Sequence, residues 1–196
     1  MNKDGFYALR IHPIIFMAII TIFCIVVTSA LYLFTADRVE SNELFFLRRS
    51  VLDAAAISHD GSLSAVEETY TSLVTQEENR YIIKDESGET TAVVEKTGAG
   101  LWGPITIMVG FTGPSTLSGV AILSQNETPG LGARIEEPWF TSQFAGKSGP
   151  FRLVEEGTSD SDDEIDSITG ATRTSVAFRD ILNSVVKDGS TIYKDL

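Results

Sequence analysis

A hydroxyl-rich segment, residues 166–175, reads DSITGATRTS and precedes the last helix that the sequence predicts. Free backbone N–H groups at a helix N-terminus, together with the positive end of the helix dipole, favour a bound phosphate group. Capping of the helix by the hydroxyl of Thr174 or Ser175 is the simpler interpretation, and it requires no ligand. The glycine–lysine–hydroxyl signature of a Walker loop is missing, so the segment is not a phosphate loop of that kind.

Two glycine-rich loops could bring the backbone close to a ligand. Residues 98–104 read GAGLWGP and precede a predicted strand, whereas residues 127–132 read ETPGLG and follow one. Glycine permits close approach of the backbone, and Trp102 offers a flat apolar surface with one hydrogen-bond donor. The Pro129-Gly130 pair is typical of a tight turn. Each loop alone is equally compatible with an ordinary turn beside a core aromatic residue.

The sequence has few of the residues that disulfides, metal sites, hydrolytic centres or nucleic-acid-binding surfaces require. The single cysteine, Cys24, excludes an internal disulfide, a cysteine-based zinc site and an iron–sulfur cluster. A hydrolytic centre in the soluble part would depend on His59 alone. The formal net charge of −12, without a basic patch, argues against nucleic-acid binding. The acidic stretch 155–166 lacks the spacing of a calcium-binding EF-hand, so we expect a solvated, mobile loop and no metal site.

An uncharged apolar run covers residues 14–34. As a helix it would be roughly 30 Å long, which is enough to cross the hydrocarbon core of a membrane. Lys3 and Arg10 precede the run, and acidic residues follow it. We therefore expect a single span of the cytoplasmic (inner) membrane, with the N-terminus in the cytoplasm and the following domain outside it, in the periplasm. A cleaved signal peptide is the alternative, because residues 28–30 are small, but the run is long for one and continues past them.

The rest of the chain mixes helical and strand patterns, which predicts an α+β domain after the membrane helix, with hairpin strands and flanking helices. In the second expected helix, Ser64 followed by Glu67 predicts a capping box. We divide the chain into residues 1–36, 37–88 and 89–196. The expected helices are 37–58, 62–74, 136–144 and 175–187; the expected strands are 80–84, 90–96, 104–111, 116–124 and 151–155, with a turn at 85–88.

Taken together, three segments resemble the FMN-binding domain family. Residues 167–172, SITGAT, are similar to its flavin-attachment motif, residues 127–132 to its ETPGLG loop, and residues 100–103 to its GLW loop. Over about residues 90 to 190 the chain resembles the G subunit of the Rnf electron-transport complex and the C subunit of the Na⁺-translocating NADH:quinone oxidoreductase (NQR). Arg173 departs from the pattern, because this position is usually apolar in the family.

The resemblance implies that the phosphate of FMN is esterified to Thr172 and that a flavin transferase attaches it, using FAD as donor and Mg²⁺. We expect further cofactor-binding residues around this bond: Thr128, Leu131, Gly132, Trp102, Thr169, Gly170 and Ser175. A cation near the flavin ring would favour its reduction, and Arg134 and Lys147 are the candidates.

We therefore expect a membrane-anchored electron carrier with covalent FMN, acting as a subunit of an ion-pumping Rnf-type (ferredoxin:NAD⁺ oxidoreductase) or NQR-type complex. It would be an enzyme only as an electron-transfer subunit of such a complex, without a catalytic residue of its own. Expected partners are the other subunits, the flavin transferase and the membrane, but no nucleic acid. Residues 51–55 and 100–103 favour the NQR subunit, whereas residues 107–110 and 169–175 favour Rnf. A non-redox binding module and a single-pass assembly scaffold remain as alternatives.

Overall fold

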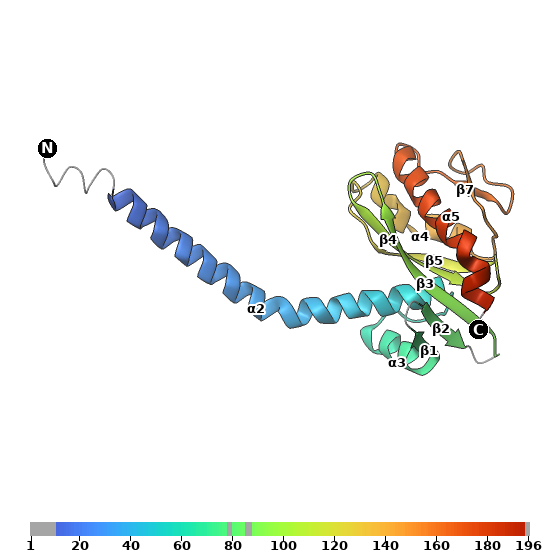
Figure 1. Cartoon of the computed structure of the whole chain (residues 1–196), viewed down its shortest axis with the longest axis horizontal. Helices are drawn as coiled ribbons and strands as arrows, with labels where there is room; N and C mark the ends of the chain where they lie inside the picture. Colours follow the sequence, from blue (N-terminus) through green and yellow to red (C-terminus); the bar gives the residue numbers. More distant parts are fainter. Residues whose placement is uncertain (1–10, 78–79, 85–87, 195–196) are drawn as a thin grey trace, which may run out of the picture. The chain divides into compact units, whose positions relative to one another are not determined.

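The computed structural model describes residues 11–77, 80–84 and 88–194. Lys3 and Arg10, on which the expected orientation depends, lie outside the described residues, as do residues 85–87 of the expected turn. The contacts separate two compact units, with the boundary between Leu44 and Phe45. The mixed helix-and-strand class that the sequence predicts is confirmed (Figure 1).

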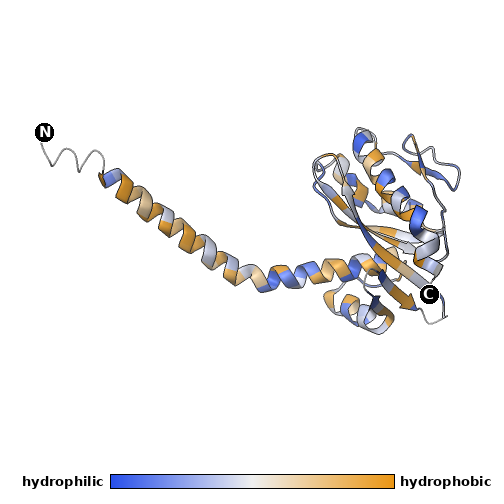
Figure 2. Ribbon diagram, in the orientation of Figure 1, coloured by the Kyte–Doolittle hydropathy of each residue, from blue (hydrophilic) through white to orange (hydrophobic). Residues whose placement is uncertain are grey.

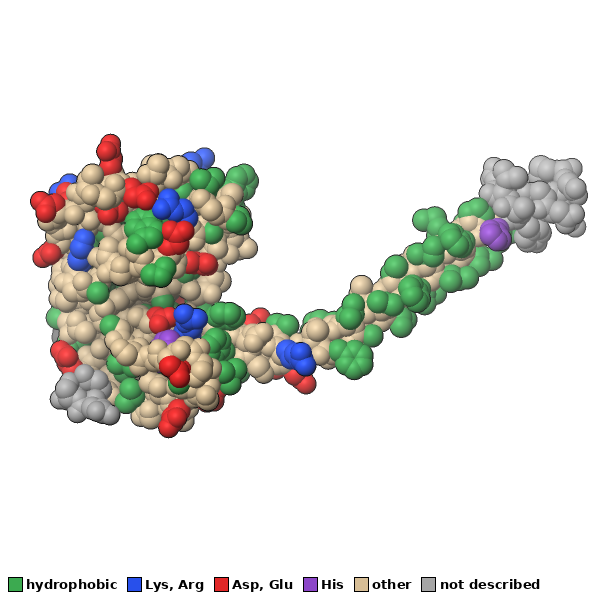
Figure 3. Space-filling view, turned by 180° about the vertical axis from the view of Figure 1, so that it is seen from behind, with side chains coloured by type: hydrophobic (Ala, Val, Ile, Leu, Met, Phe, Trp, Pro, Cys, Tyr) green, Lys and Arg blue, Asp and Glu red, His purple; other side chains and the backbone are tan. Residues whose placement is uncertain are grey.

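Helix α2 runs from His12 to Ala54 and joins the predicted membrane span to the predicted helix that follows it. No glycine or proline interrupts residues 14–54, so nothing in the sequence ends the helix between these two segments. The helix is long and apolar enough to cross a membrane, and none of the side chains in its apolar stretch is buried. Figure 2 shows that this stretch is hydrophobic, and apolar side chains cover it in Figure 3.

The second unit is built on a five-stranded antiparallel sheet with the order β1-β2-β3-β4-β5 (Figure 1). Two predicted strands have the expected bounds, and β1 was not predicted. The strands are β1 (Val74–Glu77), β2 (Arg80–Lys84), β3 (Thr90–Ala99), β4 (Pro104–Phe111) and β5 (Leu117–Ser124). Since β1 carries largely exposed polar residues at an edge, it lacks the apolar alternation that marks a strand.

Both faces of this sheet are buried, which explains the continuous apolar run of β4. On one face Ile107 and Val109 pack with residues of helix α5 (Thr172–Lys194), including Phe178. On the other face Met108 packs with Val51 near the end of α2. The helix α5 therefore lies on the opposite side of the sheet from residues 51–55.

The end of α2 approaches the sheet at a pair of glycines, one in β4 and one in β5. Gly110 pairs with Gly119 across the two strands, and a Cβ atom at Gly110 would lie 2.1 Å from the carbonyl oxygen of Ala54. The buried Ser118 hydroxyl donates to the same oxygen at 2.7 Å. The glycine pair thus admits the helix end, and Ser118 satisfies one of its free carbonyls.

Two predicted elements have different forms in the structure. The expected helix 136–144 consists of three short pieces: η2 (Gly132–Glu136), α4 (Pro138–Thr141) and η3 (Ser142–Phe144). The extended backbone of Glu137, which precedes a proline, separates the first two pieces. The predicted capping box is wrong, because helix α3 (Leu63–Leu73) is capped by Ser62, whose side chain accepts from the N–H of Ala65.

The predicted strand near residue 151 is present as β6 (Arg152–Val154), which pairs in parallel with β7 (Glu164–Asp166). The connection between them is the acidic stretch. Both ends of this connection are held by the two-stranded sheet, because β6 precedes it and β7 follows it.

Candidate functional site

Thr172 is the first residue of α5 and is exposed. The chain reaches it through a tight turn, in which the N–H of Ala171 donates to the carbonyl of Ile168 at 2.9 Å. Gly170 lies within this turn at φ +82°, a conformation that glycine adopts without strain. The turn therefore places on the surface, at the start of a long helix, a hydroxyl that bonds to none of the residues the structure describes.

The start of α5 has no side-chain cap. The preceding residue, Ala171, has no side-chain oxygen, and the helix begins three residues earlier than the sequence predicted. Thr174 and Ser175 consequently lie inside the helix, so the prediction that one of them caps it is wrong. Among the described residues, the N–H groups of Thr172, Arg173 and Thr174 donate to no other residue. Such free N–H groups, with the helix dipole, form an anion-binding position.

The hydroxyls of Ser175 and Thr174 instead hold the turn and the helix in place. Ser175 donates to the carbonyl of Ala171 at 3.1 Å and accepts from the N–H of Ile168 at 3.0 Å. Thr174 donates to Oε2 of Glu127 at 2.5 Å. Both hydroxyls are buried, and each donates its proton to an acceptor in the interior.

Glu127 connects the three segments that the sequence singled out. Its Oε1 atom accepts from the N–H of Leu101 at 2.7 Å and of Trp102 at 3.1 Å, whereas Oε2 accepts from Thr174. The side chain is buried, at 5% exposure. One carboxylate therefore joins the GLW loop, the ETPGLG loop and the first turn of α5.

Two glycines make this arrangement sterically possible. A Cβ atom at Gly100 would lie 2.5 Å from Oε1 of Glu127. A Cβ atom at Gly132 would lie 2.7 Å from the Thr174 hydroxyl oxygen and 2.8 Å from the Glu127 Cβ. Separations this short are not found in proteins, so both positions require glycine for close approach.

A groove of about 610 Å³ lies beside Thr172. One wall comes from the end of β3 and the GLW loop, residues 99–101, and the other from α5 between Thr172 and Ser184. Apolar side chains of the helix, such as Val176 and Ile181, line it together with the charged residues Arg173 and Asp180. The groove offers an apolar surface with polar edges next to the exposed hydroxyl.

The remaining predicted cofactor-binding residues differ in their exposure to solvent. Trp102 is 70% exposed and Leu131 is 46% exposed, which is unusual for large apolar side chains and leaves both available for contact. Leu131 lies beside the turn, because its Cδ2 would be 3.4 Å from a Cβ atom at Gly170. Thr128 and Thr169 are exposed, whereas Gly132 is buried behind Glu127.

Arg134 and Lys147, the candidate cations, are both engaged by other groups. Arg134 pairs with Glu156 at 3.0 Å and with Glu137 at 3.3 Å. Lys147 donates to the carbonyl of Glu164 at 2.6 Å. Arg134 therefore contributes to this region through Glu156, whose other oxygen accepts from the N–H of Thr169 at 2.7 Å.

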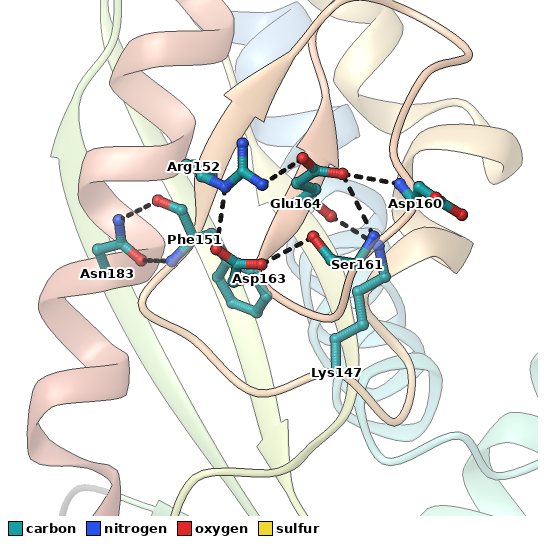
Figure 4. Close-up of polar contacts among 8 residues, drawn as sticks. All are labelled: Lys147, Phe151, Arg152, Asp160, Ser161, Asp163, Glu164 and Asn183. Carbon is teal, nitrogen blue, oxygen red and sulfur yellow. Dashed lines mark hydrogen bonds and ion pairs between the residues drawn. The ribbon is translucent and has the colours of Figure 1, made fainter.

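The acidic stretch is organised by hydrogen bonds (Figure 4). Arg152 pairs with Asp163 and Glu164, and a carboxylate oxygen of Glu164 accepts from the N–H groups of Asp160 and Ser161. No group of three or more His, Cys, Asp or Glu side chains that could hold a metal ion occurs among the described residues. These bonds hold β6, β7 and their connection together, and the bond from Thr169 to Glu156 joins the connection to the turn before Thr172.

Comparison with known proteins finds a family that is similar to the segment containing these motifs. Residues 100–187 match the FMN-binding domain family. The matched segment contains Gly100, Glu127, Gly132 and Thr172, so the predicted resemblance is confirmed.

The relatives that this chain resembles come from two kinds of complex. The chain is 34% identical over 114 residues to the G subunit of the Na⁺-translocating ferredoxin:NAD⁺ oxidoreductase complex of Acetobacterium woodii, covering 56% of this chain and 53% of the relative. It is 37% identical over 107 residues to the C subunit of the Na⁺-translocating NADH-quinone reductase of Pasteurella multocida, covering 48% and 40%. The chain thus spans about half the length of these relatives.

The G subunit of an ion-translocating oxidoreductase complex of Pasteurella multocida is 26% identical over 93% of both chains. Among solved structures, the C subunit of the Na⁺-translocating NADH-quinone reductase of Parabacteroides distasonis has a TM-score of 0.67 at 25% identity, covering 79% of this chain and 94% of that one. The NqrC structure of Shewanella oneidensis, at 21% identity and a TM-score of 0.65, shows the same fold. The apolar helix and these relatives support a membrane-anchored protein.

Glu127 was not predicted to be important. The proline and the glycines of its loop were interpreted as a tight turn, but the acidic residue that opens the loop was assigned no role. A signal was present, because a carboxylate that opens a glycine-rich loop shortly after a strand can accept hydrogen bonds from nearby backbone N–H groups.

Proposed function

We propose that this protein is a membrane-anchored electron-carrier subunit in which FMN is bound covalently through its phosphate to Thr172. The observation that carries the proposal is the uncapped start of α5, with an exposed threonine hydroxyl as its first side chain. The match of residues 100–187 to the FMN-binding domain supports the identity of the cofactor.

The attachment proceeds from a flavin dinucleotide. The hydroxyl oxygen of Thr172 attacks the phosphorus of the FMN half of FAD, the bond from that phosphorus to the bridging oxygen breaks, AMP leaves, and the hydroxyl proton is lost. A flavin transferase with Mg²⁺ performs this step, because the metal offsets the charge of the phosphates. The resulting phosphodiester carries one negative charge, which the free N–H groups of the first turn of α5 stabilise.

The residues around Thr172 suit a flavin in size and polarity. Leu101, Trp102 and Leu131 are exposed apolar side chains, and the groove along α5 adds further apolar surface. When bound, FMN supplies one-electron or two-electron transfer. The protein's own contribution is to hold, orient and partly bury the cofactor, and no residue of the chain acts as an acid or base in electron transfer.

We further propose that the subunit acts within a membrane complex that couples electron transfer to ion movement, of the Rnf type or the NQR type. The similarity to subunits of both complexes supports this assignment without choosing between them. The FMN domain lies outside the cytoplasm, on the orientation expected from the flanking charges. Ion movement belongs to partner subunits, because one uncharged helix offers no ion path.

Co-expression with a flavin transferase tests the proposal. Wild-type protein should be fluorescent in a denaturing gel and should gain the mass of one FMN less one water, whereas Thr172→Val should show neither. Thr191→Val is the matched control, because Thr191 is an exposed threonine near the other end of the same helix. Colourless wild-type protein, produced with an active transferase, would contradict the proposal and favour a non-redox binding module or assembly scaffold.

A further inference from the structure

The two walls of the groove beside Thr172 are joined by a single side chain. The GLW loop reaches Glu127 through the N–H groups of Leu101 and Trp102, and α5 reaches it through the Thr174 hydroxyl. Thr174 lies in the same helical turn as Thr172. The position of the attachment hydroxyl relative to the opposite wall therefore depends on this carboxylate.

We infer that Glu127 is a positioning residue for flavin attachment, holding Thr172 and the GLW loop in the relation that the transferase requires. The inference rests on the proposed function and adds to it a residue that does not contact the reacting atoms. It concerns how efficiently the hydroxyl accepts the flavin, and it assigns the Thr174 hydroxyl to the same task.

A carboxylate suits this position better than an amide. All three of its partners donate hydrogen bonds, and a carboxylate is an acceptor at both oxygens. A glutamine could accept from the loop N–H groups only by directing its NH₂ group at Thr174, whose own proton would then have to turn away within a buried site. Thr174 is 1% exposed, so that proton would have no water to bond.

The arrangement also leaves the first turn of α5 free for a phosphate group. Because Thr174 donates to Glu127 and Ser175 donates to Ala171, neither hydroxyl competes for the N–H groups at the helix start. Loss of the Glu127 contact would release the Thr174 side chain and loosen the turn that carries Thr172. A displacement of about 1 Å can lower a group-transfer rate by up to roughly 10²-fold.

The test is the initial rate of flavin attachment to purified full-length protein in detergent, with FAD, Mg²⁺ and a flavin transferase. Glu127→Gln and Thr174→Val should each lower the rate of flavin attachment by about tenfold or more, mainly through kcat of the transferase. Thr174→Ser should keep the wild-type rate, because serine retains the hydroxyl. Glu136→Gln is the matched control: Glu136 is an exposed glutamate of η2, which follows the same loop.

Amide hydrogen exchange in the same proteins before flavin attachment supplies an independent reading. Exchange at Leu101, Trp102 and Ser175, whose N–H groups are hydrogen-bonded, should be faster in Thr174→Val and unchanged in Thr174→Ser. All rates are measured well below the unfolding temperature of each variant, so that a general loss of stability does not lower them.

The outcomes separate this inference from the proposed function. If wild-type protein takes up flavin on Thr172 and both Glu127→Gln and Thr174→Val take it up at the wild-type rate, the positioning role is overturned and the carrier function stands. If wild-type protein takes up no flavin, the proposed function itself fails. If Glu127→Gln does not fold, Thr174→Val, which removes only one donor, decides the question together with its serine counterpart.

Discussion

Gly132 and Thr174 lie so close that the hydroxyl oxygen of Thr174 occupies the space a Cβ atom at Gly132 would need, at 2.7 Å. The two residues come from different motifs, and their contact is the point where the ETPGLG loop meets α5. Any side chain at position 132 must therefore separate the loop from the helix.

Gly132→Ala should accordingly destabilise the protein by about 1–3 kcal/mol, the usual cost of overpacking a close contact. It should also weaken flavin uptake, because the same displacement breaks the bond between Thr174 and Glu127. Denaturant unfolding of the full-length protein in detergent measures the first effect. Gly113→Ala is the control, because its Cβ would meet nothing closer than Thr116 at 3.7 Å, and it should change stability by no more than about 0.5 kcal/mol.

The C-terminus of α2 offers a stabilising substitution. Ala56 has φ 59°, and the N–H groups of Ala56 and Ile57 donate back to the carbonyls of Asp53 and Leu52. This is the Schellman arrangement, in which glycine is the favoured residue. The left-handed conformation costs an alanine about 1–2 kcal/mol, and glycine's greater backbone entropy offsets part of the gain.

Ala56→Gly should therefore raise the free energy of unfolding by about 0.5–1 kcal/mol. Ala65→Gly, in the first turn of helix α3, should have the opposite sign, because glycine is unfavourable in a helix. Equal signs for the two variants would show that the conformation of Ala56 does not carry the cost assigned to it.

Ser118 provides a test of how α2 is held against the sheet. Its buried hydroxyl donates to the carbonyl of Ala54 at 2.7 Å, and Ser118→Ala would leave that carbonyl without this partner. We expect a loss of about 1–3 kcal/mol in unfolding free energy. Ser124→Ala, at the exposed end of the same strand, should be nearly neutral, and a comparable loss there would rule out a specific role for the Ser118 bond.

Glu156 gives the turn before Thr172 a dependence on pH. The N–H of Thr169 and the guanidinium of Arg134 lower the pKa of its carboxyl from 4.5 to about 2. A lowered pKa means that the folded protein favours the ionised form, so the contribution is fully present above about pH 4.5. It is then lost as the pH falls from 4.5 towards 2.

The difference in stability between wild-type protein and Glu156→Gln should therefore be constant near neutral pH and shrink over that acidic window. Titration of the Glu156 carboxyl by NMR measures the pKa directly. In Arg134→Gln the pKa should rise only part of the way, because the Thr169 N–H, the largest cause, remains. A pKa unchanged by this substitution would contradict the pairing of Arg134 with Glu156.

The sequence predicted the bounds of two strands correctly, but it did not predict where helix α5 begins. Strands β2 and β4 have the predicted bounds because their apolar residues lie between clear turn signals. The start of α5 was placed three residues too late, since Thr172, Arg173 and Thr174 include two threonines, which are poor helix formers. Their helical conformation depends on Glu127 and on the turn at Gly170, which are contacts that no local pattern records.

The motifs of the candidate site could be recognised in the sequence, but the hydrogen bonds that join them could not be predicted from it. Three segments could be recognised separately, but their meeting at one carboxylate requires the sheet to bring Leu101 and Glu127 together. The same holds for Arg134, a plausible free cation in the sequence that the fold pairs with Glu156. Long-range pairing of this kind depends on tertiary packing and is invisible to periodicity.

The exposure of Thr172, in contrast to the burial of Glu127 and Thr174 beneath it, has a practical consequence. If FMN is attached at Thr172, a chain that has not brought these segments together would present the transferase with a threonine in a loose peptide, whereas a finished domain would present it on a rigid support. The yellow colour of a preparation would then report the proportion of molecules that are correctly assembled, and a library of variants could be screened for foldedness by eye.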